Sequence, residues 1–353
     1  MDSNIGTIFI GGRRIGSGCP CFFIAEAGVN HNGDLKRAIE LIDVAAEAGA
    51  DAVKFQTFRA QNLVLRSAAK VGYQARNTDA DEGQFEMLRK LELSADDHAC
   101  LIDHCDQRGV MFLSSPFDDD SVELLESLDL PAIKVPSGEL VNTSYLVKLG
   151  KMGRPLIVST GMATLVEVGE AVAALRAAGS TQFVLLHCTT DYPTSPEDAN
   201  LRAMRLLQDT YACPVGYSDH TLGPDVTIAA VAMGACVIEK HFTLDRNLPG
   251  PDHGASLEPD ELASLVNSIR RVEAALGSGR KEPTASEVLN AVSIRKSIVA
   301  ARRLEQGTSL TKDMVSYKRP GDGLKPSSLP LILGKRLLRT VKVDEKLTPE
   351  LFE

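Results

Sequence analysis

Eight short apolar segments recur between residues 22 and 243 of the 353-residue chain, and nearly all of them end in polar or ionisable side chains. Each is followed by a stretch with helical character, and this alternation of strand and helix produces a parallel sheet. The segments end at Glu26, Lys54–Gln56, Ser114–Ser115, Lys134–Ser137, Ser159, Thr189–Thr190, Ser218–His220 and Glu239–His241. Eight such units predict an α/β fold, a TIM (β/α)8 barrel with its active site at the carboxyl ends of the strands.

A pair of glycines near the N-terminus predicts a small hairpin ahead of the barrel. Gly11 and Gly12 tolerate positive φ and separate the short runs Thr7–Ile10 and Arg13–Gly16. We expect this hairpin to close the bottom of the barrel. The barrel strands are expected at Phe22–Glu26, Ala50–Thr57, Val110–Phe117, Ala132–Pro136, Pro155–Gly161, Phe183–Thr190, Pro214–His220 and Val237–Thr243.

The segment after the second strand is longer than a usual connection. Residues from Phe58 to about Leu93 separate that strand from the next helical stretch. Loops of this length are usually lids or binding elements. We therefore expect the insertion to cover the active site.

The composition changes around residues 276–287, where the sequence LGSGRKEPTASE is rich in Gly, Pro, Ser and charge. Stretches of this kind connect domains. We expect a barrel domain over residues 1–280, a linker over 281–293 and a small β-rich domain over 294–353. Short β-like runs at Ser297–Ala300 and Arg336–Val341 support the last assignment.

Charge and composition narrow the class of partner. The net charge is −9, so we expect neither nucleic acid nor an anionic membrane surface as a partner. No apolar run reaches the roughly 20 residues of a membrane span, and the N-terminus lacks the features of a targeting segment. Seven cysteines without an export signal indicate reduced thiols. These features favour a cytoplasmic location.

Side-chain parity indicates which polar groups share a face, because residues two apart in a strand point the same way. The pairs that share a face are Lys54 with Gln56, Ser218 with His220, and Glu239 with His241. Inward polar groups at these strand ends are catalytic in TIM barrels. Lys240 falls on the opposite face and must reach solvent or a partner past the helices.

His220 and His241 end neighbouring strands, which lie ~4.8 Å apart in a sheet. Two imidazoles at this spacing could bind one divalent ion, with water and substrate oxygens as the other ligands. The alternative is a pair of hydrogen-bonded histidines in the core. The nearby acidic residues Glu26 and Glu239 favour the metal site.

Lys54 and Lys134 are expected among apolar neighbours, where an unpaired ammonium group is costly. A bound phosphate or carboxylate would offset this cost. Hydroxyl groups at the same rim would complete a phosphocarboxylate site, namely those of Ser115, Ser137, Ser159 and Ser218. Two alternatives stay open. Lys134 could form a structural ion pair with Glu139 or Glu26, and a lysine could form a Schiff base, as in class I aldolases.

At these positions the chain resembles a known family. The motifs are IAEAGVNHNG (24–33), DAVKFQT (51–57), KVPSGE (134–139), STGM (159–162), GYSDHT (216–221), IEKHFT (238–243) and GPDHGASLEPDEL (250–262). With them the chain resembles the sialic acid synthase family over nearly its whole length. RKSIVAARRL (295–304) and YKRPGDGL (317–324) are similar to that family's C-terminal antifreeze-like (SAF) domain.

The resemblance implies a metal-dependent condensation of phosphoenolpyruvate with N-acetylmannosamine, giving N-acetylneuraminate and phosphate with C–O cleavage. It implies Mn²⁺, or Mg²⁺ or Co²⁺ in its place, bound by His220 and His241. The residues that it assigns to phosphoenolpyruvate are Lys54, Ser115, Lys134, Ser137, Ser159 and Ser218. Those that it assigns to the sugar side are Glu26, Gln56, Tyr192, Glu239, Asp252 and Arg319. In relatives the arginine matching Arg319 reaches the partner subunit's barrel, which implies a domain-swapped homodimer.

The mechanism that follows from this resemblance is a hypothesis in three parts. The metal ion acts as a Lewis acid on the sugar aldehyde, and C3 of phosphoenolpyruvate attacks the carbonyl carbon. Water then adds at C2, with Glu26 or Glu239 as general base. Lys54 and Lys134 hold the phosphate and the carboxylate.

Two positions depart from the pattern of some bacterial sialate synthases, which have Asn where this chain has Thr190 and Thr where it has Ser115. Ser115 keeps the hydroxyl, whereas Thr190 leaves room for a different sugar substituent. The alternative function is therefore the synthesis of legionaminate from a 2,4-diacetamido-2,4,6-trideoxyhexose, with pseudaminate ranked below it. A sugar-phosphate synthase would need a further basic cluster, which the sequence lacks. A carbohydrate-binding C-terminal module and a non-catalytic barrel are the remaining alternatives.

Overall fold

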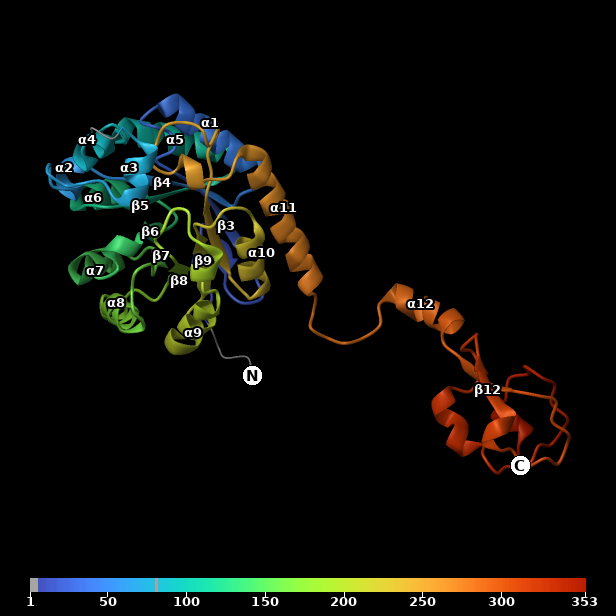
Figure 1. Ribbon diagram of the computed structural model, residues 1–353. Helices are drawn as coiled ribbons and strands as arrows, with labels where there is room; N and C mark the ends of the chain where they lie inside the picture. The colour runs from blue at the N-terminus through green and yellow to red at the C-terminus, as the bar shows by residue number, and fades with distance from the viewer. Residues whose placement is uncertain (1–5, 80–81) are drawn as a thin grey trace. The chain divides into compact units, whose positions relative to one another are not determined.

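The computed structural model describes residues 6–79 and 82–353. The chain divides into two compact units, Met1–Gly277 and Ser278–Glu353. The first unit contains a large barrel and the second a small domain (Figure 1). Among the described residues, no helix is both long enough and apolar enough to cross a membrane.

Eight parallel strands form the barrel, in the order β5-β4-β3-β10-β9-β8-β7-β6. β5 and β6, at the two ends of this order, pack against each other, so the sheet closes nearly into a cylinder. The strands are β3 (Phe22–Gly28), β4 (Ala52–Thr57), β5 (Met111–Pro116), β6 (Ile133–Val135), β7 (Leu156–Ser159), β8 (Phe183–Cys188), β9 (Val215–Asp219) and β10 (Val237–His241). The predicted (β/α)8 barrel is confirmed.

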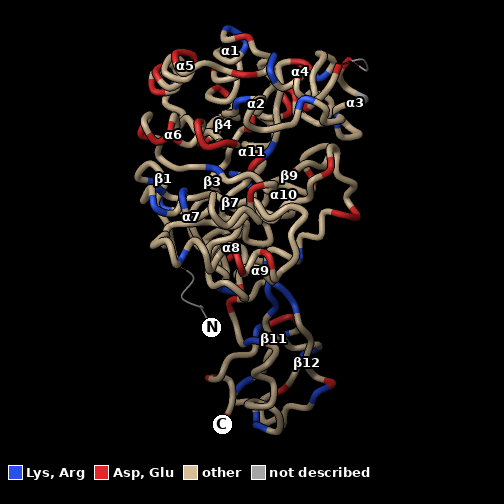
Figure 2. The backbone as a smooth tube through the Cα atoms, turned by 90° about the vertical axis from the view of Figure 1, so that its left-hand side faces the viewer, with Lys and Arg blue, Asp and Glu red and all other residues tan. Residues whose placement is uncertain are grey.

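Helices cover the outside of the barrel (Figure 1). They are α1 (Leu35–Glu47), α5 (Ala95–Arg108), α6 (Asp119–Ser127), α7 (Thr143–Lys151), α8 (Leu165–Ala177), α9 (Arg202–Tyr211), α10 (Asp225–Ala232) and α11 (Pro259–Leu276). A capping box of Thr164 and Glu167 starts α8. The first turns of α5 and α6 are acidic, as the red segments of Figure 2 show, which suits the positive end of each helix dipole.

Alternation along the strands separates two apolar cores. Outward side chains such as Phe23 and Phe55 pack against the helices. Inward side chains such as Phe22 and Leu113 fill the lower barrel together with Ile10 of the N-terminal hairpin. This hairpin pairs β1 (Ile8–Ile10) with β2 (Arg13–Ile15) in antiparallel fashion. As predicted, it closes the bottom of the barrel.

The described residues of the insertion after β4 form three short helices, α2 (Ala60–Leu63), α3 (Gly72–Asn77) and α4 (Gln84–Arg89). It approaches the loop after β3 so closely that a Cβ at Gly33, where φ is +74°, would lie 2.1 Å from the carbonyl oxygen of Lys90. Only glycine suits both the backbone conformation and this contact. The insertion is therefore seated on the carboxyl ends of the barrel strands.

The second unit has a small apolar core of its own, to which Ile298, Leu304 and Val341 belong. Its strands β11 (Ser297–Ala300) and β12 (Val315–Lys318) pair antiparallel. The run expected at Arg336–Val341 forms only isolated bridges, because its residues pair with three separate segments. The expected linker contains helix α12 (Ala285–Ile294), which starts with a capping box of Thr284 and Glu287.

Short 3-10 turns complete the structure. Two of them, η1 and η3, follow β6 and β10 at the upper end of the barrel. They are η1 (Ser137–Glu139), η2 (Pro196–Asp198), η3 (His253–Ala255), η4 (Lys312–Met314), η5 (Pro326–Leu331) and η6 (Pro349–Leu351).

Candidate active site

A cavity of about 340 Å³ lies at the carboxyl ends of the barrel strands, under the insertion. It brings together nearly all the site residues predicted from the sequence. Those that line it are Glu26, Lys54, Gln56, Ser115, Lys134, Ser137, Ser159, Thr190, Tyr192, Ser218, His220, Glu239, His241 and Asp252. Arg319 lies in the second unit, directly after β12.

The strand register explains why these side chains meet. Glu26 of β3 is aligned with Lys54 of β4 on one side and with His241 of β10 on the other. Glu239 of β10 is aligned with Ser218 of β9. All of these positions face inward, so polar groups of neighbouring strands lie beside one another at the same height.

Two lysines and two glutamates form a buried ion-pair network at the floor of the cavity. Lys54 Nζ lies 2.8 Å from Glu26 Oε2 and 3.7 Å from Glu239 Oε2. Lys134 Nζ lies 3.5 Å from Glu239 Oε1 and 2.7 Å from Ser159 Oγ. The ion-pair partner of Lys134 is therefore Glu239, and the alternative pairing with Glu139 or Glu26 is not found among the described residues. Across a closed barrel, parity gives the face of a side chain but not its partner.

The two glutamates have opposite pKa shifts. Burial raises the pKa of Glu26 to about 7, although Lys54 opposes this rise. Glu239 is also buried, but Lys134, Lys54 and a hydrogen bond from Ser218 outweigh burial and lower its pKa to about 2. Such a divergence separates the group that exchanges protons from the group that stays charged. Glu26 can gain or lose a proton near neutral pH, whereas Glu239 remains an anion.

The same buried surroundings also shift the pKa values of the two lysines. Burial lowers the pKa of Lys134, and the charge of Glu239 offsets only part of this effect. Burial acts on Lys54 too, but Glu239 and Glu26 outweigh it and raise the pKa. Ser115 Oγ lies 3.0 Å from Lys54 Nζ and accepts its hydrogen bond. The floor thus presents ammonium groups whose positions are already fixed by carboxylates and hydroxyls.

His220 and His241 lie side by side above this floor, with ring centroids 5.5 Å apart. Nδ1 of His220 donates a hydrogen bond to the carbonyl oxygen of Thr189 (2.7 Å), which leaves a lone pair on Nε2. Burial lowers the pKa of His241 well below its ordinary value. Its Nδ1 is buried and has no hydrogen-bond partner among the described residues. The two imidazoles fit a divalent metal ion once His220 has lost its second proton.

Other features of the histidine pair limit this fit. Burial lowers the pKa of His220, but Cys188, Thr189 and Glu239 together outweigh burial, so the net shift is upward and metal binding would have to displace a proton. The described part of the chain contains no group of three or more His, Cys, Asp or Glu side chains arranged to hold a metal. Water or substrate oxygens would therefore supply the other ligands.

Aromatic and polar side chains form the upper wall of the cavity. The ring of Tyr192 lies 4.0 Å from that of His220 and 4.9 Å from that of Tyr73, measured between centroids. Burial raises the pKa of Asp252, on the same wall, to about 6. The wall thus combines rings with a carboxyl group that is partly protonated near pH 6.

Comparisons with known proteins agree with this geometry. A family model described as the NeuB family matches residues 41–281, and a SAF domain model matches residues 295–353. The chain belongs to the NeuB family. The predicted resemblance to the sialic acid synthases is confirmed, and so is the assignment of the chain as an enzyme.

Relatives of this NeuB family chain are named as synthases of several different products. It is 47% identical over 342 residues to the N,N'-diacetyllegionaminic acid synthase of Legionella pneumophila, covering 96% of each chain. It is 40% identical to the N-acetylneuraminate-9-phosphate synthase of Homo sapiens, covering 97% of this chain and 95% of the relative. The crystal structure of an N-acetylneuraminic acid synthetase from Leptospira borgpetersenii in complex with citrate has a TM-score of 0.71 at 35% identity. It covers 81% of this chain and 95% of that one.

The structure adds cavity residues that the sequence did not indicate. In this NeuB family member the insertion contributes Phe58, Leu63, Val64, Tyr73, Gln74, Gln84, Met87 and Leu88 to the lining. The length of the insertion predicted a lid, but the short helices carry no pattern that marks which side chains face inward. Cys188 also lines the cavity, as the last residue of β8. Its parity with Leu186 and Val184, which fill the barrel interior, could have placed it there.

Proposed function

We propose that this protein condenses phosphoenolpyruvate with 2,4-diacetamido-2,4,6-trideoxymannose to give N,N'-diacetyllegionaminate and phosphate. The observation that carries the reaction class is one buried cavity in which Lys54, Lys134, Glu26 and Glu239 lie beneath two histidines. The choice of sugar is favoured by the identity of 47% to the legionaminic acid synthase, against 40% to the N-acetylneuraminate-9-phosphate synthase. Formation of N-acetylneuraminate from N-acetylmannosamine is the second candidate, and pseudaminate ranks below both.

Thr190 supports the choice of a sugar with two acetamido groups. It lines the cavity at a position where some bacterial sialate synthases have Asn. A threonine is shorter than an asparagine and presents a methyl group, so it leaves space for an additional substituent. The oxygen of Thr190 also lies close to Gly161, where a Cβ would come within 2.2 Å of it. The available space is therefore set by two small residues facing each other.

The lysines would hold the two anionic groups of phosphoenolpyruvate. Lys54 already contacts Ser115, and Lys134 already contacts Ser159. Ser137 Oγ accepts a hydrogen bond from the backbone N–H of Gly161 (3.0 Å) at the same rim. Donors that are fixed before the ligand arrives need little reorganisation during the reaction, and buried donors act more strongly than exposed ones. The arrangement suits a phosphate and a carboxylate bound side by side.

We propose Mn²⁺ as the metal, with Mg²⁺ or Co²⁺ able to take its place, held by His220 and His241. When bound, such an ion would polarise the aldehyde oxygen of the open-chain sugar. The chain's own contribution is to orient His220 through the carbonyl group of Thr189 and to keep His241 neutral through burial.

Glu26 is the group proposed to move protons. In the overall reaction a bond forms between C3 of phosphoenolpyruvate and the aldehyde carbon. Water adds at C2, and phosphate leaves with the bridging oxygen. A carboxylate with a pKa of about 7 can accept the proton of that water near neutral pH. Glu239, with a pKa of about 2, stays ionised and keeps Lys54 and Lys134 charged and in place.

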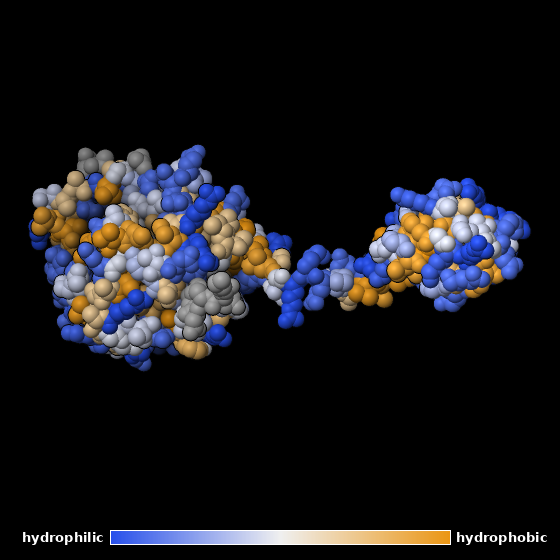
Figure 3. Space-filling view, turned by 90° about the horizontal axis from the view of Figure 1, so that it is seen from below, coloured by the Kyte–Doolittle hydropathy of each residue, from blue (hydrophilic) through white to orange (hydrophobic). Residues whose placement is uncertain are grey.

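We propose further that the active unit is a domain-swapped homodimer. Arg319 belongs to the second unit, and the resemblance to the sialic acid synthases assigns its contact with the sugar to the barrel of a second copy. Helix α12 exposes apolar side chains, with Leu289 at 77% exposure and Val292 at 54%. Figure 3 shows such apolar side chains among polar ones at the surface of both units. An exposed apolar helix face of this kind is suited to a protein contact.

The experiment that tests the function supplies phosphoenolpyruvate and Mn²⁺ with one of three sugars. They are 2,4-diacetamido-2,4,6-trideoxymannose, N-acetylmannosamine and N-acetylmannosamine 6-phosphate. Phosphate release and product mass are measured, with EDTA and His241→Ala as controls. Faster turnover of the diacetamido sugar supports the proposal, and faster turnover of N-acetylmannosamine supports the second candidate. No turnover of any sugar by the folded dimer would refute both.

A further inference from the structure

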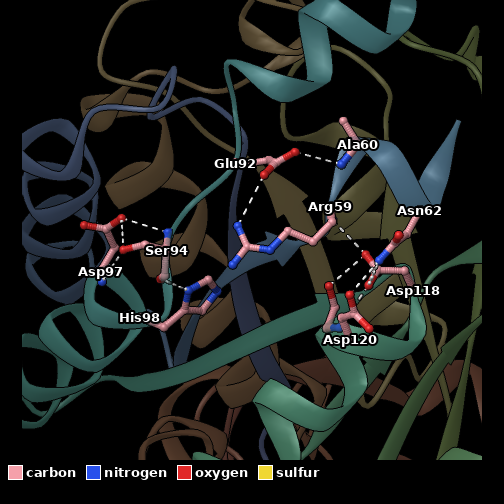
Figure 4. Close-up of polar contacts among 10 residues, drawn as sticks. Arg59, Ala60, Asn62, Glu92, Ser94, Asp97, His98, Asp118 and Asp120 are labelled. Carbon is pink, nitrogen blue, oxygen red and sulfur yellow. Dashed lines mark hydrogen bonds and ion pairs between the residues drawn. The ribbon is translucent and has the colours of Figure 1, made fainter. Parts of the chain in front are cut away.

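Figure 4 shows Glu92, near the end of the insertion, facing the two residues near its beginning. Glu92 Oε1 accepts a hydrogen bond from the backbone N–H of Ala60 (2.8 Å). Glu92 Oε2 forms an ion pair with Arg59 Nη1 (3.2 Å). The insertion leaves the barrel at Phe58, so one carboxylate joins the point where the chain departs to the point where it returns.

Each side of this contact is attached to the rigid barrel. Asp118, which follows β5, accepts a hydrogen bond from the backbone N–H of Arg59 (2.7 Å) and caps α6 through Ser121. On the other side, Ser94 and Asp97 form the capping box that starts α5, two residues after Glu92 (Figure 4). Glu92 is therefore held by a fixed helix end and can in turn hold the start of the insertion.

The residues next to this contact form part of the cavity wall. Phe58 precedes Arg59, and Leu91 precedes Glu92. Both belong to a small buried cluster with Val29 that is separate from the main core. Leu63 and Leu88 pack against the same cluster, and both line the cavity together with Phe58. A shift at the Glu92 contact would therefore move the apolar wall against which a substrate packs.

We infer that Glu92 is a positioning residue that fixes the insertion over the active site and thereby sets the affinity for the sugar. It is not among the residues that line the cavity, so it acts through Arg59, Ala60 and the wall next to them. The inference rests on the proposed function for its kinetic readout only. Its structural readout, the protection of the insertion from hydrogen exchange, needs no substrate.

The test compares Glu92→Ala with Glu92→Gln and with Arg89→Ala in the full-length protein. Glu92→Gln keeps an oxygen that can accept from the N–H of Ala60 but loses the charge facing Arg59. Arg89→Ala removes an exposed ion pair of the same insertion, with Glu86, that has no part in the contact. Hydrogen exchange is followed by mass spectrometry on peptides from residues 58–79 and from the barrel strands.

For Glu92→Ala we expect faster exchange in residues 58–79 and unchanged exchange in the strands. The KM for the sugar should rise about tenfold, because one charge-assisted hydrogen bond that holds the insertion is lost. The value of kcat should change by less than about threefold. Glu92→Gln should be intermediate, and Arg89→Ala should match the wild type. Unchanged exchange in the insertion, or an equal increase throughout the barrel, overturns the inference. If no sugar is turned over, the proposed function fails, but the exchange comparison still decides the role of Glu92.

Discussion

Lys240 Nζ lies 2.7 Å from Asp219 Oδ2 on the outer face of the barrel, and each residue immediately precedes one of the two cavity histidines. The side chains are almost completely buried, at 1% and 0% exposure. The register of β9 and β10 aligns the two residues directly. Asp219 also accepts hydrogen bonds from Thr221. This ion pair therefore fixes the two strand ends that carry His220 and His241. Asp219 is thus the partner of Lys240.

Replacing Lys240 by methionine should destabilise the protein by about 3–5 kcal/mol, because it leaves the buried carboxylate of Asp219 without its partner. Urea unfolding followed by circular dichroism measures this free energy. Arg205→Ala, which breaks an exposed ion pair with Asp209, is the control and should cost less than about 0.5 kcal/mol. Equal losses for the two variants would contradict the special role of the buried pair.

The activity should depend on the ionisation of Glu26. Its pKa is raised to about 7, and a general base acts only when deprotonated, so kcat/KM should increase with pH and level off above about pH 7. Glu26→Gln should lower kcat by about 10²–10⁴-fold and abolish this pH dependence. The exposed Glu170→Gln serves as the control. A pH profile that is identical in Glu26→Gln would show that another group is responsible.

The same shift predicts how stability varies with pH. Glu26 has a pKa of about 7 in the folded protein and an ordinary value of 4.5, so between these values the folded state binds more protons than the unfolded state. Stability should therefore fall as the pH rises from 4.5 to 7. Compared with Glu26→Gln, the wild type should lose roughly 1–3 kcal/mol more over this interval. Urea titrations of both proteins at the two pH values measure the difference, and a constant difference would be the contrary result.

Gly161 should tolerate no side chain. A Cβ there would lie 2.2 Å from Thr190 Oγ1 and 2.8 Å from Ser137 Oγ, both in the cavity wall. Gly161→Ala should therefore reduce kcat/KM by about 10- to 100-fold through displacement of these hydroxyls. Gly6→Ala is the control, because nothing lies within 4 Å of its Cβ position and Gly6 does not line the cavity. Similar kinetics for the two variants would argue against a role for this contact.

Removing either imidazole should weaken metal binding without unfolding the protein. We expect His220→Ala and His241→Ala to bind Mn²⁺ at least about tenfold more weakly, since each removes one of two protein ligands. Titration of free Mn²⁺ by electron paramagnetic resonance measures this affinity directly. His104→Ala, which alters a histidine paired with Asp43 outside the cavity, should bind as the wild type does. If all three variants bind Mn²⁺ equally, the histidine pair is not the site.

Much of the site followed from local sequence, because strand alternation and register are local properties. Glu239 and His241 had to share a face, and the parallel register then placed Glu239 beside Ser218. Contacts across the barrel could not be obtained in this way. Glu239 is the partner of Lys134 because of the way the sheet closes, and this closure cannot be predicted from the sequence of any single segment. The start of α12 was visible in the sequence, since Thr284 and Glu287 have capping-box spacing, but the Gly and Pro nearby favoured a linker.

The N-terminal hairpin also affects how small molecules reach the site, because it closes the lower end of the barrel. Ile8, Ile10 and Ile15 fill its lower end together with the first inward residues of the strands, so in the described part of the chain that end is packed with apolar side chains. Lys54 precedes Gln56, and Glu239 precedes His241, along strands that run towards the open end. An anion held by the lysines therefore sits deeper than a sugar held near the histidines. Under the proposed function, phosphoenolpyruvate would therefore enter before the sugar, and phosphate would leave after the nine-carbon product.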